Sequence, residues 1–322
     1  MYAIVALDLP TDGFFSLDTL QFKVTPEFRG VVGVSDGLHL VTAGLNESAD
    51  RTCLFLQVGL NAMNDNDQPP VILLRWQRSE EILVRVWDPQ ELHRVSSAIY
   101  RGDFNQSFAR ISEDTLGDNL LSLMDPRVAF RIQTGCGGQA GWNWSTIPST
   151  VIQTSITGCH LDKTPTLKAV SFPGSILSHA PDWLPSELHA AFLLFIVGQK
   201  YEGFMQWKAL VVLQSHCMQA IYEYPHIYKN LCLVLAQEVT LLPNDFLIDP
   251  ITEGNFFAIA VGSLLENIKD VIHSPGDHEG GDVNGLVQAS YKLKNAMDTK
   301  FGPNWAVDEG PILVDSENDV LY

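Results

Sequence analysis

Residues 184–257 read LPSELHAAFLLFIVGQKYEGFMQWKALVVLQSHCMQAIYEYPHIYKNLCLVLAQEVTLLPNDFLIDPITEGNFF, and they carry the strongest apolar periodicity in the chain. Apolar side chains recur three and four residues apart, which is the spacing of one face of an α-helix. Pro225 and Pro243 each end a periodic run, because proline has no amide hydrogen and clashes with the preceding turn. The stretch therefore predicts three antiparallel core helices, with its Trp and Phe side chains in the core.

Two further long helices are expected after this stretch. Apolar residues at helical spacing cover residues 257–272 and 286–301. Pro275 follows the first of these runs and Gly302 follows the second, and both residue types commonly follow the end of a helix. The region 184–301 is therefore predicted to be an all-α bundle.

The chain up to about residue 87 has an apolar period of two. Turn signals such as Asp12-Gly13 and Asp36-Gly37 separate about seven short runs. Closely spaced strands without intervening helices favour an antiparallel sandwich or barrel. The apolar residues that define the clearest strands are Leu20, Phe22 and Val24, then Leu54, Leu56, Val58 and Leu60, then Ile82, Val84 and Val86.

Residues 88–170 contain fewer clear signals. Asp88 followed by Pro89 and Glu91 predicts a helix start, because Asp caps the first turn and proline fits the first helical position. A short helix is also expected after Ser112. The sequences VAFRIQT at 128–134 and LKAVSF at 167–172 read as strands.

These patterns divide the chain into four segments. The expected fold class is α+β multidomain, with an antiparallel β-sandwich-like N-terminal domain followed by an all-α helical-bundle C-terminal domain. The expected bounds are 1–157 for the β-rich domain, 158–183 for a proline-containing linker, 184–301 for the helical domain and 302–322 for an extended acidic tail.

Composition limits the classes of partner. The 20 Lys and Arg residues are outnumbered by 38 Asp and Glu residues, and the formal net charge is −18. This balance argues against direct nucleic-acid binding, which requires clustered positive charge. No run reaches the roughly 20 apolar residues that span a bilayer, so we expect no membrane contact.

The cysteines are odd in number and show no CxxC spacing. This pattern favours reduced thiols in cytosol or nucleus over a disulfide framework or a zinc site. The five are Cys53, Cys136, Cys159, Cys217 and Cys232.

No catalytic pattern is recognisable. The nine histidines form no HExxH pair, and no Gly-x-Ser-x-Gly elbow occurs. His216 is next to Cys217, but neighbours on a helix point about 100° apart, so Cys217 is expected to pack in the bundle. Glu187, Glu202 and Glu223 are expected on solvated faces. We therefore expect no enzyme activity, no cofactor and no metal.

One stretch matches a relaxed dinucleotide-binding pattern. Gly135, Gly137 and Ala140 have the required spacing, and Asp162 follows about twenty residues later. A phosphate cradle needs a helix directly after the glycines, whereas β-branched residues and Pro148 follow here. A surface loop is the favoured interpretation, and a nucleotide-dependent enzyme is a weak alternative.

The order of residues in several stretches resembles one family. ELHAAF, GQKYEGFMQWKAL and LPNDFL in the helical region, with LDLPTDGFFSLD, PEFRGVVGVSDGLHLV and VILLRW near the start, are similar to the Aar-two family of cistron-splicing factors. The matching residues are the turns at 7–10 and 28–30 and the strand end at 75–76, and the match is weakest over 103–170.

This resemblance implies a non-catalytic, monomeric assembly factor of pre-mRNA splicing, located in cytoplasm and nucleus. The implied partner is the scaffold protein Prp-eight, bound through its RNase H-like and Jab/MPN-like domains in the U5 snRNP precursor. Occupying both domains would keep RNA and the helicase Brr-two away until maturation. A helical peptide-recognition or trafficking module is the alternative, and it would make the tail dispensable.

The acidic tail contains one β-branched segment, and Ser316 follows it. The resemblance implies that this segment adds as a strand to an exposed sheet edge of the partner. A disordered tail, or a strand returning to the first domain, is the alternative. Ser316 stands before Glu317 and Asp319, where an acidic-directed kinase could act, and its phosphorylation would weaken pairing. The residues of the segment are Pro311, Ile312, Leu313, Val314 and Asp315.

Overall fold

The chain divides into two compact units. The computed structural model describes residues 2–59, 71–111, 120–133, 142–148, 162–170, 182–248, 255–273 and 283–305. One unit comprises Met1–Ile147 with Lys168–Leu210, and the other comprises Pro148–Leu167 with Val211–Tyr322. This division differs from the expected segments, because the helix that begins at Leu184 belongs to the unit that contains the strands.

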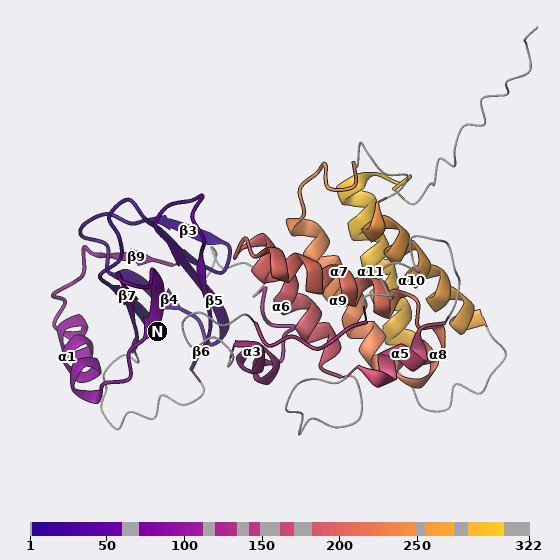
Figure 1. Cartoon of the computed structure of the whole chain (residues 1–322), viewed down its shortest axis with the longest axis horizontal. Coiled ribbons are helices and arrows are strands. Elements are labelled where there is room, and N and C mark those ends of the chain that lie inside the picture. Colours follow the sequence, from indigo (N-terminus) through magenta and orange to yellow (C-terminus); the bar gives the residue numbers. More distant parts are fainter. Residues whose placement is uncertain are drawn as a thin grey trace, which may run out of the picture. The chain divides into compact units, whose positions relative to one another are not determined.

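The described strands form two sheets in the first unit (Figure 1). One sheet has five strands in the order β8-β7-β1-β4-β9, and the other has four in the order β3-β2-β5-β6. The strands are β1 (Tyr2–Leu7), β2 (Phe14–Leu17), β3 (Leu20–Lys23), β4 (Gly30–Val34), β5 (Gly37–Gly44), β6 (Thr52–Val58), β7 (Val71–Gln77), β8 (Ile82–Arg85) and β9 (Phe108–Arg110).

The predicted two-part fold class, β-rich and then helical, is confirmed, with a difference in strand pairing. Among the described strands β1 pairs with β7 in parallel, and β4 pairs with β9 in parallel. A parallel pair needs a long crossover. Here the crossovers are long: in chain order, strands of the second sheet lie between β1 and β7, and helix α1 (Pro89–Tyr100) lies between β4 and β9. The remaining pairs are antiparallel, as expected.

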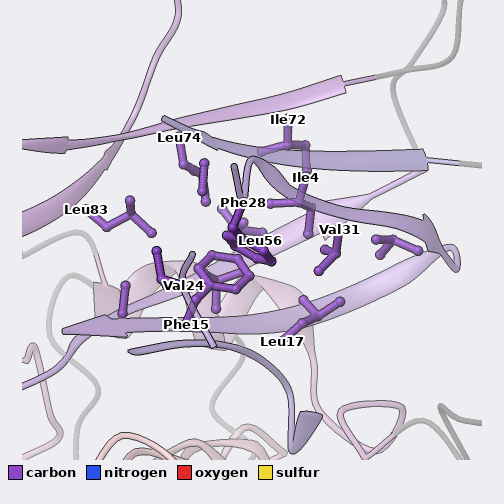
Figure 2. Packing of buried hydrophobic residues seen from close by; sticks show 14 of the residues in the cluster. Ile4, Phe15, Leu17, Val24, Phe28, Val31, Leu56, Ile72, Leu74 and Leu83 are labelled. Carbon is purple, nitrogen blue, oxygen red and sulfur yellow. The ribbon is translucent and has the colours of Figure 1, made fainter. Parts of the chain in front are cut away.

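The main core of this unit lies between the two sheets. Figure 2 shows Ile4, Ile72 and Leu74 from the five-stranded sheet facing Phe15 and Leu17 of the other sheet. All five are buried. On the opposite face of the five-stranded sheet, Val5 and Leu73 pack against Val95 of helix α1 (Pro89–Tyr100).

The glycine of the PEFRG motif, Gly30, is required for a steric reason. Gly30 has φ +130°, and a Cβ atom there would lie 2.0 Å from the carbonyl oxygen of Ile4. Only glycine fits such a close approach of two strands. The arginine of the RW motif also has a structural role, because Arg75 forms ion pairs with Glu91 of α1 and, at 3.3 Å, with Asp8.

The predicted helix start at residue 88 is confirmed, whereas two predicted strands are helices. The Asp88 side chain accepts a hydrogen bond from the Gln90 amide at the start of α1. The run 128–134 was expected to be a strand, but its described residues, up to Gln133, belong to helix α3 (Pro126–Gln133). The run 167–172 was also expected to be a strand, but it overlaps helix α5 (Thr164–Ala169). In each case an aspartate just before the helix accepts an amide hydrogen bond, as an N-cap does.

The described residues from Leu184 to Leu241 form four helices in place of the expected three. They are α6 (Leu184–Ile196), α7 (Tyr201–Ser215), α8 (Met218–Glu223) and α9 (Pro225–Leu241). The extra break lies at Cys217, whose φ of −111° and ψ of 68° are not helical. Pro225 is the first residue of α9, where its missing amide costs nothing.

The two later helices are confirmed as α10 (Phe256–His273) and α11 (Val283–Phe301). Helix α11 packs along α9. No helix among the described residues is long and apolar enough to cross a bilayer. Cys53, Cys217 and Cys232 are buried and form no disulfide with one another, while Cys136 and Cys159 lie outside the described residues.

Candidate functional site

A groove on the first unit is the main candidate site. Its volume is about 1030 Å³. It is lined by β6 and the loop before it, by β8 and the turn before it, by Trp142 and by the connection between α6 and α7. The lining includes Asp50, Arg51, Leu54, Trp76, Glu80, Glu81, Leu83, Arg85, Trp87, Trp142, Lys200, Tyr201 and Glu202.

The groove forms where the edges of the two sheets meet. Strand β8 is the last strand of one sheet and β6 is the last strand of the other. The Leu83 amide donates a hydrogen bond to the Thr52 hydroxyl at 3.3 Å, which joins the two edges. Edge strands present unpaired backbone groups, which proteins either cover or use for binding.

The edge of β6 is covered by a side chain of α3. The Phe55 amide donates to Oε1 of Gln133 at 2.5 Å, and Nε2 of Gln133 donates to the Phe55 carbonyl at 3.3 Å. The Gln133 amide thus takes the place of a neighbouring strand at this point. The sequence interpretation missed this contact, because it assigned residues 128–134 to a strand.

Two basic side chains, Arg51 and Lys200, hold the segment just before Tyr201 against the β-rich region. The Arg51 guanidinium lies 3.9 Å from the centre of the Phe14 ring and donates a hydrogen bond to the Val197 carbonyl at 2.8 Å. Lys200 forms an ion pair with Asp50. The connection between α6 and α7 is therefore held in place beside the loop before β6.

Two aromatic side chains stand exposed at the groove. Trp87 is 68% exposed and Tyr201 is 72% exposed. Exposed aromatic residues at a concave surface are typical anchors of protein interfaces. The Arg85 guanidinium lies 3.9 Å from the centre of the Trp87 ring, and burial lowers the pKa of Arg85.

The exposed charges around the groove are mostly negative. Asp50, Glu80, Glu81 and Glu202 are exposed carboxylates. Of the cations in the lining, Arg51 is buried, Lys200 is paired with Asp50 and Arg85 lies over Trp87. We call the four exposed carboxylates the acidic rim, and the apolar lining residues Leu54, Trp76, Leu83 and Trp142 the apolar floor.

Glu187 is buried, which corrects the expectation that it lies on a solvated face. Its Oε1 accepts hydrogen bonds from the Ser145 amide, the Ser145 hydroxyl and Nε2 of Gln206 at 2.9, 2.9 and 2.7 Å. Its Oε2 has no hydrogen-bond partner, and burial raises the pKa of the carboxyl to about 7. Glu202 and Glu223 are exposed, as expected.

The buried Glu187 supports the groove through a short segment. Ser145 belongs to residues 142–148, and Trp142 of the same segment lines the groove. The Trp142 ring packs edge-on against Phe55, with ring centres 6.3 Å apart. Glu187 is therefore a positioning residue for one side of the groove.

Most of the residues singled out in the sequence lie outside the described part of the chain. Pro311, Ile312, Leu313, Val314, Asp315 and Ser316 lie outside the described residues, as do Gly135, Gly137 and Ala140. Asp162 caps α5 through the Thr164 amide, at 3.0 Å.

His216 and Cys217 do not bond each other in the contacts described. Nδ1 of His216 bonds the Val212 carbonyl at 2.8 Å and the Cys217 thiol bonds the Leu213 carbonyl at 3.0 Å. Burial raises the pKa of the Cys217 thiol, which makes it a poor nucleophile. Across the described ranges, no group of three or more His, Cys, Asp or Glu residues is arranged to hold a metal ion.

The described part of the chain thus defines an α+β protein with a two-sheet unit, a mostly helical second unit and a groove of about 1030 Å³ on the first. Two family models match it, the AAR2 N-terminal domain over residues 2–160 and the AAR2 C-terminal repeat region over residues 143–308. The chain belongs to the AAR2 family, which confirms the resemblance noted from its motifs.

Individual relatives agree with this assignment. The AAR2 homolog of Homo sapiens is 30% identical over 313 residues, covering 79% of this chain and 79% of that protein. The homolog of Oryctolagus cuniculus is 25% identical over 274 residues, covering 79% and 76%. The homolog of Caenorhabditis elegans is 32% identical over 98 residues, which is 30% of this chain and 28% of that protein.

Proposed function

We propose that this protein is a non-catalytic assembly factor of pre-mRNA splicing, acting in cytoplasm and nucleus. Its partner is the scaffold protein Prp-eight in the U5 snRNP precursor, bound at the RNase H-like and Jab/MPN-like domains. Membership of the AAR2 family supports this role. By occupying both domains, the protein keeps RNA and the helicase Brr-two away until maturation.

The observation that carries the proposal is the groove with its two exposed aromatic side chains. Trp87 and Tyr201 line one cavity of the first unit, and both are mostly exposed. Large aromatic residues that become buried on association supply a large share of binding energy in many interfaces. The acidic rim suits a basic surface on the partner, such as one that otherwise contacts RNA.

The tail provides the second contact in this proposal. The segment Pro311, Ile312, Leu313, Val314 and Asp315 adds as a strand to the partner, and phosphorylation of Ser316 weakens that pairing. Two contacts joined through one chain raise each other's effective concentration, so neither needs to be tight alone.

A pull-down with recombinant Prp-eight carboxy-terminal domains tests the proposal. The proteins compared are the full chain, a chain ending at Trp305 and the Trp87→Ala, Tyr201→Ala double variant. Ending at Trp305 keeps Gly302 after α11 and the hydrogen bond from Nε1 of Trp305 to Asp298, 2.9 Å long. The truncation therefore removes the tail without disturbing the helix end.

We expect the full chain to bind, and the truncated chain and the double variant each to bind about tenfold more weakly or worse. Tyr100→Ala is the matched control, because Tyr100 is 66% exposed on α1 of the same unit and does not line the groove. No binding by the full chain would overturn the proposed function. Unchanged binding by the double variant would remove the groove from it.

A further inference from the structure

The groove already holds one guanidinium, and that contact indicates what else it can hold. Arg85 lies over the Trp87 ring at 3.9 Å, yet the indole remains 68% exposed. A cation over an aromatic face is attracted by the negative charge of that face. The exposed remainder of Trp87 and the exposed ring of Tyr201 are therefore open to a second cation from outside.

The surrounding charges favour a cation and oppose an anion. Glu80, Glu81 and Glu202 are exposed at the groove, whereas Arg51 is buried and Lys200 is paired. The formal net charge of −18 adds a long-range attraction for basic partners. Nucleic acid and phosphate-bearing ligands would be repelled by the same groups.

The edge of β8 offers backbone groups to an extended chain. Val86 donates its amide to the Leu73 carbonyl across the ladder, whereas the Leu83 amide is turned outward to Thr52. In an antiparallel pair alternate residues point their backbone groups the same way. The amide and carbonyl of Arg85 are therefore directed away from β7, toward the groove.

The floor is apolar and suits aliphatic side chains. Trp76 and Leu83 are 3% and 2% exposed, and Leu54 and Trp142 complete the floor. The cavity of about 1030 Å³ lies at the upper end of the range for ligand pockets, so it can take several side chains of one segment.

We propose that this groove binds an extended protein segment in which arginine alternates with aliphatic residues. Its guanidinium groups stack on Trp87 and Tyr201 and pair with Glu80, Glu81 and Glu202. Its backbone hydrogen-bonds the outward edge of β8 at Arg85. The inference deepens the proposed function by naming the chemistry of the bound segment, and its test requires no scaffold protein.

Fluorescence anisotropy with labelled peptides and the full chain tests this inference. The probe is acetyl-Val-Arg-Val-Arg-Val-Arg-Val-amide, and the matched peptides replace every arginine by citrulline, lysine or glutamate. Citrulline keeps the shape of arginine and removes its charge. We expect the arginine peptide to bind about tenfold tighter than the citrulline peptide, the lysine peptide to fall between them, and the glutamate peptide not to bind.

Protein variants locate the binding. Trp87→Ala and Tyr201→Ala should each lower the affinity for the arginine peptide about tenfold. Tyr100→Ala should leave that affinity unchanged. Trp87→Phe should retain most of the affinity, because a phenyl ring still offers a face to the cation. Glu80→Gln with Glu81→Gln should weaken binding and reduce its salt dependence.

Two results would overturn the inference. Equal binding of the arginine and citrulline peptides would show an apolar groove without cation preference. Unchanged binding by Trp87→Ala would show that the peptide follows the net charge of the protein and not the groove. If the arginine peptide shows no preference but Prp-eight still binds, the proposed function stands and this inference fails. If the arginine peptide binds as expected but Prp-eight does not, the inference about the groove stands and the proposed function fails.

Discussion

At the scale of single residues, buried titratable groups decide how stability depends on pH. Burial lowers the pKa of His39, but the hydrogen bond and charge of Asp18 and the hydrogen bond to Ser35 raise it above its ordinary value overall. Glu187 has no nearby positive charge among its described contacts, so burial dominates and raises its pKa to about 7. Both groups favour the protonated form in the folded state.

The substitution Glu187→Gln isolates the buried carboxyl. A pKa raised from 4.5 to about 7 means that its contribution to stability is complete below about pH 4.5 and lost as the pH rises through about 7. At about 1.36 kcal/mol per unit, the loss is about 3 kcal/mol. We expect the free energy of unfolding of the wild-type protein to fall by that amount relative to Glu187→Gln between about pH 4.5 and 8.

Urea unfolding of both proteins across this range provides the measurement. The contribution of His39 is present in both proteins and cancels in the difference. Parallel pH profiles for the two proteins would contradict the assignment of a neutral Glu187.

At the scale of elements, the edge of β6 shows how a helix can substitute for a strand. Gln133 bonds both backbone groups of Phe55, and it stands at the end of α3. Covered in this way, the edge cannot pair with another chain at Phe55. The same arrangement leaves the edge of β8 as the accessible one in the groove.

The substitution Gln133→Ala tests this arrangement. It would leave the Phe55 amide and carbonyl without their partner, and we expect a loss of about 2 kcal/mol in the free energy of unfolding. Arg127→Ala on the same helix is the control, because its side chain is 76% exposed and pairs only at the surface with Asp125. The measurement is the free energy of unfolding in denaturant. Equal values for Gln133→Ala and the wild-type protein would show that water replaces the Gln133 side chain at no cost.

At the scale of the whole molecule, the chain path interleaves the two units. The first unit contains residues 168–210 as well as the N-terminal strands, and the boundary falls inside α7. In helix α6 every residue from Leu184 to Leu194 is buried, on all sides of the helix. A helix buried on all sides depends on the elements that surround it.

A fragment of residues 184–322 should therefore not fold as a stable domain. It retains α6 and lacks the strands of its unit, so we expect it to bind an apolar fluorescent dye strongly and to unfold without a cooperative transition. The full chain is the reference, and we expect it to show neither property. Cooperative thermal unfolding of the fragment without dye binding would show that the helical region is independent of the strands.

Features that depend on local chemistry could be predicted from the sequence. The two-sheet region followed by helices, the start of α1 at Asp88 and the family membership all follow from periodicity, caps and short motifs, which are properties of neighbouring residues. The errors at α3 and α5 arose because short apolar runs are compatible with either period. By contrast, contacts between distant parts of the chain determine which polar side chains are buried and which sheet edges meet. The burial of Glu187, the cover that Gln133 forms over β6 and the groove at Trp87 and Tyr201 each join residues far apart in the chain, and no local pattern encodes such distances.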